Sequence, residues 1–144
     1  MGTEYVDLWQ IHRPDILTHP QEIARTIEDA HKAGKIRAFG VSNFTTAQIT
    51  TLAQFSSVPI VSTQPELSPL RIDTIENGEL DQAIAMDLAV LAWSPLGGGR
   101  IGDPGDTREQ NVAAALSGVA AAHGVSRTAA AYSWIMAHPA RPIP

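Results

Sequence analysis

The 144-residue sequence contains no cysteine and no long apolar run. Without cysteine the chain has neither disulfides nor thiolate metal sites, and this composition fits a reducing, cytoplasmic location. No stretch of about 18 apolar residues is present, so no segment is predicted to span a membrane. The first residues, MGTEYVDLW, lack a basic stretch followed by an apolar core, so no export signal is visible. We therefore predict a cytoplasmic protein without membrane contacts.

Clustered basic charge is also missing. The formal net charge is −5 at pH 7, and the 10 Lys and Arg residues are dispersed along the chain. A mildly acidic chain of this kind is a poor candidate for binding nucleic acid or anionic lipid. The five histidines show no metal-ligand spacing, so no metal site is predicted. The length favours one domain with a sizeable core, which we assign to residues 1–144.

Short apolar runs alternate with longer helical patterns along the chain. The runs rich in aromatic and β-branched residues predict strands at residues 5–12, 36–43, 58–66 and 88–94. Apolar residues at helical spacing predict helices that begin near Pro20, at Thr45 or Thr46, and near Leu80. The same spacing predicts two more helices at residues 111–123 and 126–138. A glycine-rich loop covers residues 97–107, and residues 141–144 have the character of a further strand start. This alternation predicts an α/β fold with a parallel sheet.

Two parallel architectures fit this rhythm, a doubly wound sheet and part of a (β/α)8 barrel. Each predicted strand ends in polar or aromatic side chains, at His12, Ser42, Gln64 and Trp93, which are separated by 30, 22 and 29 residues. In a parallel barrel all carboxyl ends open on one face, so these groups would meet at one mouth. A complete barrel needs about 250 residues, so this chain would supply roughly half of one. The alternative to a shared site is that these side chains are polar only because strand ends adjoin loops, and loops are polar.

Four segments carry a resemblance to the aldo-keto reductase family. YVDLWQIHRPD, GKIRAFGVSNF, STQPELSPL and LAWSPLGGGR occur in the family's order and at its spacings, and they cover most of the chain. The resemblance implies a partial (β/α)8 TIM barrel that runs from the family's fourth strand to the beginning of its eighth. It also implies an NAD(P)H-dependent oxidoreductase that reduces aldehydes or ketones to alcohols.

The resemblance assigns roles around the nicotinamide ring. His12 is similar to the active-site histidine that orients and polarises the substrate carbonyl. Ser42 and Asn43 resemble the pair that hydrogen-bonds the nicotinamide carboxamide, and Gln64 resembles the glutamine that joins them. Trp93 stands where the family places an aromatic ring against the nicotinamide, usually a tyrosine. Hydroxyl and amide side chains can complement the one acceptor and two donors of a carboxamide.

A second group of residues is similar to the loop that follows the pyrophosphate of the cofactor. These are Ser94, Leu96, Gly97 and Gly98. Glycines let backbone N–H groups approach a phosphate closely. The stretch GGGRIG also fits the pattern G-x-G-x-x-G, but Asp103, Pro104 and Gly105 follow it instead of a helix. This disfavours a Rossmann-type dinucleotide site there.

Part of the family's catalytic set has no counterpart here. The family takes an Asp, a Tyr general acid and a Lys from its first three strands, and neither tyrosine nor either lysine of this chain is placed to donate a proton beside His12. We hypothesise that the chain is a fragment, and we expect it to be inactive alone. Cofactor preference is open between NADP and NAD, the partner is a small carbonyl substrate, and the oligomeric state is unassigned. The alternative is a non-catalytic nicotinamide-nucleotide-binding or regulatory protein, or an inactive remnant.

Overall fold

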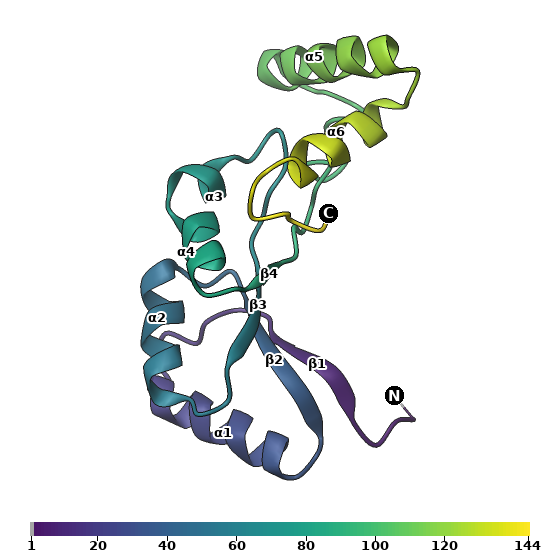
Figure 1. Cartoon of the computed structure of the whole chain (residues 1–144). Helices are drawn as coiled ribbons and strands as arrows, with labels where there is room; N and C mark the ends of the chain where they lie inside the picture. Colours follow the sequence, from purple (N-terminus) through teal and green to yellow (C-terminus); the bar gives the residue numbers. More distant parts are fainter. Residues whose placement is uncertain (1) are drawn as a thin grey trace.

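The computed structural model describes residues 2–144, in which four strands and six helices alternate. The strands are β1 (Val6–Ile11), β2 (Ile36–Ser42), β3 (Ile60–Gln64) and β4 (Ala89–Val90). The helices are α1 (Pro20–Lys32), α2 (Thr46–Phe55), α3 (Asp73–Glu76), α4 (Glu79–Ala85), α5 (Thr107–His123) and α6 (Arg127–Met136). All strand pairs are parallel and the sheet order is β1-β2-β3-β4, so each strand lies beside the next one in the sequence (Figure 1).

Side-chain caps set the start of the longer helices. Thr45 and Gln48 form a capping box at α2, as the sequence predicted for Thr45, and Ser126 caps α6 by accepting from the Ala129 N–H. Helix α5 begins at Thr107, four residues before the predicted start. The reason is a second capping box, in which the Asp106 side chain accepts from the Glu109 backbone and the Glu109 side chain accepts from the Asp106 backbone.

The two faces of the sheet differ in chemistry. Phe39 and Val41 of β2 are fully buried and pack in one apolar cluster with residues of α1 and α2, which cover that face (Figure 1). Strand alternation turns Gly40 to the opposite face. There the Ser62 hydroxyl of β3 donates to the side-chain oxygen of Gln10 of β1 across Gly40, at 2.7 Å. The face away from the helices is therefore polar beneath the strand ends.

The fourth strand is shorter than predicted, with regular pairing at residues 89 and 90 only. Single parallel bridges continue it, from Leu91 to Ile143 and from Trp93 to Glu66. Ser94 then adopts a left-handed backbone with φ 54°, which ends the extended segment. Ile143 donates its N–H to Val90 and accepts from Ala92, so the strand start predicted at residues 141–144 lies beside β4.

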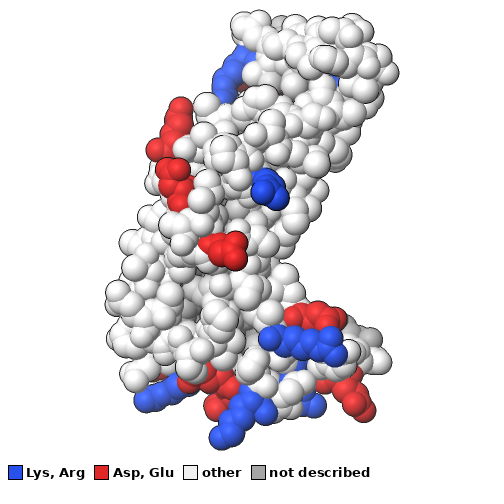
Figure 2. Space-filling model, viewed as in Figure 1, with Lys and Arg blue, Asp and Glu red and all other residues white. Residues whose placement is uncertain are grey.

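A second apolar cluster lies under α5 and α6, beyond β4 and far from β1 (Figure 1). Leu70, Ile101 and Leu116 are buried in it. Charges of both signs are interspersed around the end of the molecule that carries α1, whereas acidic side chains gather over α3 and α4 (Figure 2). Within residues 2–144, none of the helices combines the length and the apolar character that a membrane crossing requires.

Candidate functional site

Four strand ends place the predicted nicotinamide residues in one location. His12 directly follows β1, Ser42 ends β2 and Gln64 ends β3. Trp93 follows β4 and is held by hydrogen bonds at both backbone groups, from its N–H to Pro65 and from Leu67 to its carbonyl. Parallel pairing puts Ser42 directly beside Gln64 in the register. The strand register therefore brings the predicted side chains together.

A cavity of about 220 Å³ is formed where these ends meet, and it includes all five predicted residues. Its lining consists of His12, Arg13, Ser42, Asn43, Gln64 and Trp93. Ser42 is buried, Asn43, Gln64 and Trp93 are half-buried, and His12 is exposed at the rim. The volume is that of about seven waters, enough for one small aromatic ring with its substituent. The geometric prediction of a shared mouth is thus met, while the roles of the residues stay predictions.

Hydrogen bonds connect the walls of this cavity. The Ser42 hydroxyl donates to the Gln64 carbonyl oxygen at 2.8 Å, and the Asn43 N–H donates to the same oxygen at 3.1 Å. The indole N–H of Trp93 donates to Oδ1 of Asn43 at 2.9 Å. Within residues 2–144 the side chain of Gln64 has no hydrogen-bond partner, so its amide is available to a ligand.

The residues predicted to follow a pyrophosphate lie in the turn after Trp93 and outside the lining of this cavity. Gly97 donates its N–H to the Ser94 carbonyl at 2.8 Å. Its φ is 62°, a conformation that favours glycine, and a Cβ there would lie 2.8 Å from Cδ1 of Leu70, which would have to shift. Leu96 packs against the second apolar cluster. Gly98 is exposed, with φ 67°. Packing thus explains Leu96, and the backbone conformation explains Gly97.

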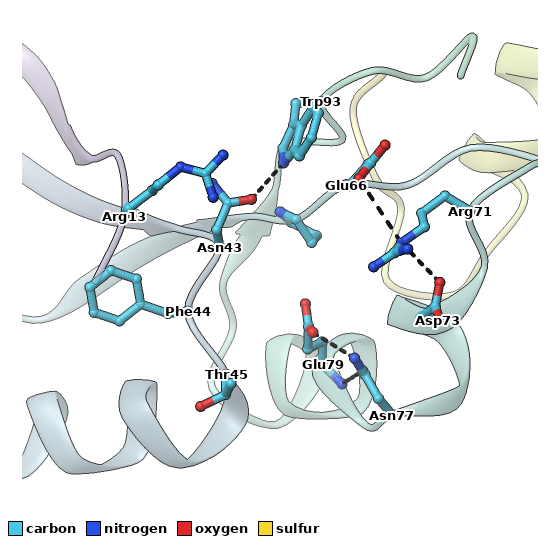
Figure 3. Close-up of a pocket in the computed structure, with 11 residues that line it drawn as sticks. Arg13, Asn43, Phe44, Thr45, Glu66, Arg71, Asp73, Asn77, Glu79 and Trp93 are labelled. Carbon is cyan, nitrogen blue, oxygen red and sulfur yellow. Dashed lines mark hydrogen bonds and ion pairs between the residues drawn. The ribbon is translucent and has the colours of Figure 1, made fainter. Parts of the chain in front are cut away.

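Arg13 is a lining residue that the sequence analysis did not single out, although it follows His12 in the HRPD segment. It also lines an adjoining polar cavity of about 300 Å³, which shares Asn43 and Trp93 with the first (Figure 3). Within the described residues its guanidinium forms no ion pair. On the far side of the larger cavity, Arg71 pairs with Asp73 at 2.9 Å. Arg13 therefore offers free donors where the two cavities meet.

The loop after His12 is ordered by its own side chains. Asp15 accepts from the Leu17 backbone N–H at 2.9 Å and from the Thr18 hydroxyl at 2.7 Å. These two donors hold the pKa of the Asp15 carboxyl below its ordinary value, so the carboxylate stays charged and keeps the turn closed. Ile16 and Leu17 at the tip of this loop are fully solvent-facing, with exposed fractions of 85% and 92%.

Tyrosine and lysine side chains lie elsewhere in the described residues. Tyr5 accepts a hydrogen bond from Arg37 near the amino end of β1, and Tyr132 is in the middle of α6. Lys32 ends α1, and Lys35 precedes β2. None of these four residues lines the cavity.

Comparison with known proteins connects this geometry to one family. The family model of the aldo/keto reductase family matches residues 1–144. A 6-dehydroglucose reductase from Novosphingobium aromaticivorans is 60% identical over 144 residues, which is 100% of this chain and 47% of that protein. A 6-dehydroglucose reductase from Agrobacterium fabrum is 39% identical and is covered to 48%. A solved thermostable aldo-keto reductase in complex with epalrestat superimposes with a TM-score of 0.86 at 26% identity, over 98% of this chain and 48% of that one.

The chain belongs to the aldo/keto reductase family. It spans about half the length of the relatives that it matches. The predicted fold class is confirmed: parallel strands alternate with helices, as in part of a (β/α)8 barrel.

Proposed function

We propose that this chain forms the cofactor side of an NAD(P)H-dependent oxidoreductase, which reduces an aldehyde or ketone of a small molecule to an alcohol. One observation carries the proposal: four strand ends converge on one cavity lined by a hydroxyl, two amides, an imidazole, a guanidinium and an indole. A nicotinamide nucleotide bound there supplies the hydride, and the protein positions it against the substrate.

The free polar groups of the cavity fit a carboxamide. Both N–H groups and the oxygen of the Gln64 amide are available, and the Ser42 hydroxyl, which donates to Gln64, keeps one lone pair for a ligand. In the proposal, Gln64 donates to the carboxamide oxygen, and Ser42 accepts from its NH2 group. The indole of Trp93 forms the aromatic wall against the ring.

The turn after Trp93 is proposed to lie along the pyrophosphate of the cofactor. The hydroxyl of Ser94 and the N–H of Gly98 have no hydrogen-bond partner among the described residues, so both can donate to a phosphate oxygen. Leu96 and Gly97 form the turn between Ser94 and Gly98, and Gly97 lies close to Leu70.

His12 is proposed to act on the substrate. Its backbone carbonyl accepts from Asn43 at 3.0 Å, which fixes the residue at the rim while the imidazole stays exposed. A ring N–H there can donate to the substrate carbonyl oxygen, where negative charge grows as the carbonyl is reduced. No proton donor is assigned within this chain.

The relatives and the adjoining cavity support a proposal for the substrate class. Both 6-dehydroglucose reductases match this chain over its whole length. The 300 Å³ cavity presents charged and hydroxyl groups, among them Arg13, Thr45 and Glu66, which suit a hydroxyl-rich molecule. We therefore propose a sugar-derived aldehyde as the substrate.

A second candidate is a protein that binds the nucleotide without turnover. It is favoured by the position of Tyr5, Tyr132, Lys32 and Lys35 outside the cavity lining. Because the chain is expected to be inactive alone, the two are separated in a full-length protein that contains it, by titration with NADPH and NADH followed by a panel of aldehydes that includes 6-dehydroglucose. Oxidation of bound NADPH by an aldehyde supports the oxidoreductase. Saturable binding without oxidation supports the second candidate, and a flat titration with both nucleotides contradicts both.

A matched pair of variants tests the proposed carboxamide contact. Gln64→Leu removes the free amide and should weaken NADPH binding about fivefold or more, the effect of one hydrogen bond. Gln54→Leu makes the same chemical change on the exposed surface of α2 and should leave the affinity unchanged. Equal affinities for the wild type and Gln64→Leu would remove this contact from the proposal.

A further inference from the structure

The side chain of Arg100 holds the glycine-rich loop at its first turn. Its Nε–H donates to the carbonyl oxygen of Gly97 at 2.7 Å, and its Nη1 pairs with Oε1 of Glu109 at 3.1 Å. Because the guanidinium is planar and its donors lie in a fixed fork, these two contacts together set its orientation. Arg100 therefore connects the carbonyl of Gly97 to the first turn of α5.

Glu109 holds this guanidinium in place. The Glu109 side chain is 9% exposed, and its Oε2 accepts from the N–H groups of Gly105 at 2.7 Å and Asp106 at 3.4 Å. The Asp106 side chain in turn accepts from the Glu109 N–H at 2.8 Å. Hydrogen bonds between charged partners are roughly twice as strong as neutral ones. The position of the Arg100 guanidinium is therefore set by the start of α5.

The bond to Gly97 determines the direction of one particular N–H. The peptide group between Gly97 and Gly98 is trans and planar, so the Gly97 carbonyl and the Gly98 N–H point in opposite directions. Because the carbonyl points to Arg100, the N–H points away from it. In the part of the chain that the structure describes, this N–H has no hydrogen-bond partner, and Gly98 is exposed. Arg100 therefore fixes the direction of a free backbone donor.

The backbone conformation explains why this peptide group needs to be held. The φ angles are 62° at Gly97, 67° at Gly98 and 94° at Gly99, so three left-handed glycines follow one another. Glycine adopts positive and negative φ about equally readily, so ordering such a run costs more conformational entropy than ordering other residues. The Arg100 side chain stabilises one orientation of the peptide group that joins the first two glycines.

We propose that Arg100 is a positioning residue for the cofactor: it orients the Gly98 N–H toward a phosphate oxygen of the pyrophosphate. The inference rests on the proposed function, in which the turn after Trp93 lies along the pyrophosphate and Gly98 donates to it. A backbone donor that is already oriented loses less conformational entropy when it binds an anion. Arg100 acts through the Gly97 carbonyl, so the Nε–H is the group that matters, and the charge is paired with Glu109.

Two substitutions separate the Nε–H of Arg100 from its charge. Arg100→Gln removes the charge but keeps an N–H donor, because the amide nitrogen of glutamine is the same number of bonds from the backbone as Nε of arginine. Arg100→Lys keeps the charge but places a methylene where Nε stood, so the Gly97 carbonyl loses its side-chain donor. Arg25→Lys makes the same exchange on the exposed surface of α1 and is the matched control.

The first experiment measures the NADPH dissociation constant in a full-length protein that contains this chain. Arg100→Lys should weaken binding about fivefold, the effect of one hydrogen bond, whereas Arg100→Gln and Arg25→Lys should bind within about twofold of the wild type. The opposite order, with Arg100→Lys close to the wild type and Arg100→Gln weaker, would mean that the charge itself contacts the nucleotide and would overturn the inference. Equal affinities throughout, or equal losses in both Arg100 variants, would overturn it as well.

The second experiment measures amide hydrogen exchange in the same protein without nucleotide. Exchange across residues 97–103 should be faster in Arg100→Lys than in the wild type and close to the wild type in Arg100→Gln. Exchange across α1 should be unchanged in both variants and reports an intact fold. Unchanged exchange of the loop in Arg100→Lys would overturn the positioning role. A wild type that does not bind NADPH contradicts the proposed function, and the exchange rates still decide whether Arg100 orders the loop.

Discussion

Replacing Gly40 by alanine tests how tightly the polar face of the sheet is built. A Cβ on Gly40 would collide with the Ser62 hydroxyl and the Gln10 side-chain oxygen, and it would lie 2.9 Å from the Ser62 carbonyl oxygen. The first two atoms form the hydrogen bond that crosses β2. The backbone carbonyl cannot rotate away, so the strands themselves would have to shift.

The magnitude follows from three contributions. Overpacking costs about 1–3 kcal/mol, and loss of the bond between Ser62 and Gln10 costs about 1 kcal/mol more. Alanine returns about 0.5–1 kcal/mol, because it restricts the unfolded chain. The expected loss in the free energy of unfolding is therefore about 1–3.5 kcal/mol, a large part of the roughly 5–15 kcal/mol of a typical domain.

The assay is urea unfolding followed by circular dichroism. Gly118→Ala is the matched control, because Gly118 lies inside α5 with open space around its Cβ position. The same added methyl should stabilise the protein there by about 0.5–1 kcal/mol. Gly40→Ala should also cost less in a Ser62→Ala background, where one colliding atom is gone. A Gly40→Ala midpoint equal to or above that of the wild type would refute this account of the strand packing.

Three further changes have expected outcomes. Glu28→Gln should weaken the acid dependence of stability, measured as urea midpoints across an acid pH series. The backbone N–H and then the hydroxyl of Ser57 lower the pKa of Glu28 in the folded state. The stability that Glu28 contributes is therefore present above its unfolded-state pKa and is lost as the pH falls through its folded-state pKa. Asp106→Ala should lower the free energy of unfolding by about 1 kcal/mol through loss of the cap of α5, measured by denaturant unfolding. His12→Ala should lower aldehyde reduction by the oxidoreductase, measured as turnover, and should leave the NADPH affinity, measured by titration, within about twofold. Weaker NADPH binding with unchanged turnover would contradict the assignment of His12 to the substrate carbonyl.

The strand positions were predictable because their apolar runs have to be buried between layers. The predicted strand at residues 36–43 matches β2 to within one residue. Its apolar side chains Phe39 and Val41 are buried in the cluster that includes residues of α1 and α2. The strand ends were predictable as a shared mouth for a related reason: the carboxyl ends of neighbouring parallel strands point the same way.

Other features depended on contacts that the sequence does not display. The short helix α3 was not predicted, because its four residues give no periodicity. Helix α5 starts four residues before the predicted position, although the pair Asp106 and Glu109 has the spacing of a capping box. The bond between Trp93 and Asn43 joins residues 50 positions apart, so only the folded chain reveals which groups of the amide are already engaged.

Glu109 has a consequence for protein engineering. This largely buried carboxylate completes the cap of α5, accepts from the Gly105 N–H at 2.7 Å and pairs with Arg100 at 3.1 Å. The glycine-rich loop and the first turn of α5 are therefore held together as one structural unit. A chimera that transplants the loop into another scaffold would have to carry that helical turn with it, because the loop alone leaves behind the group that closes it.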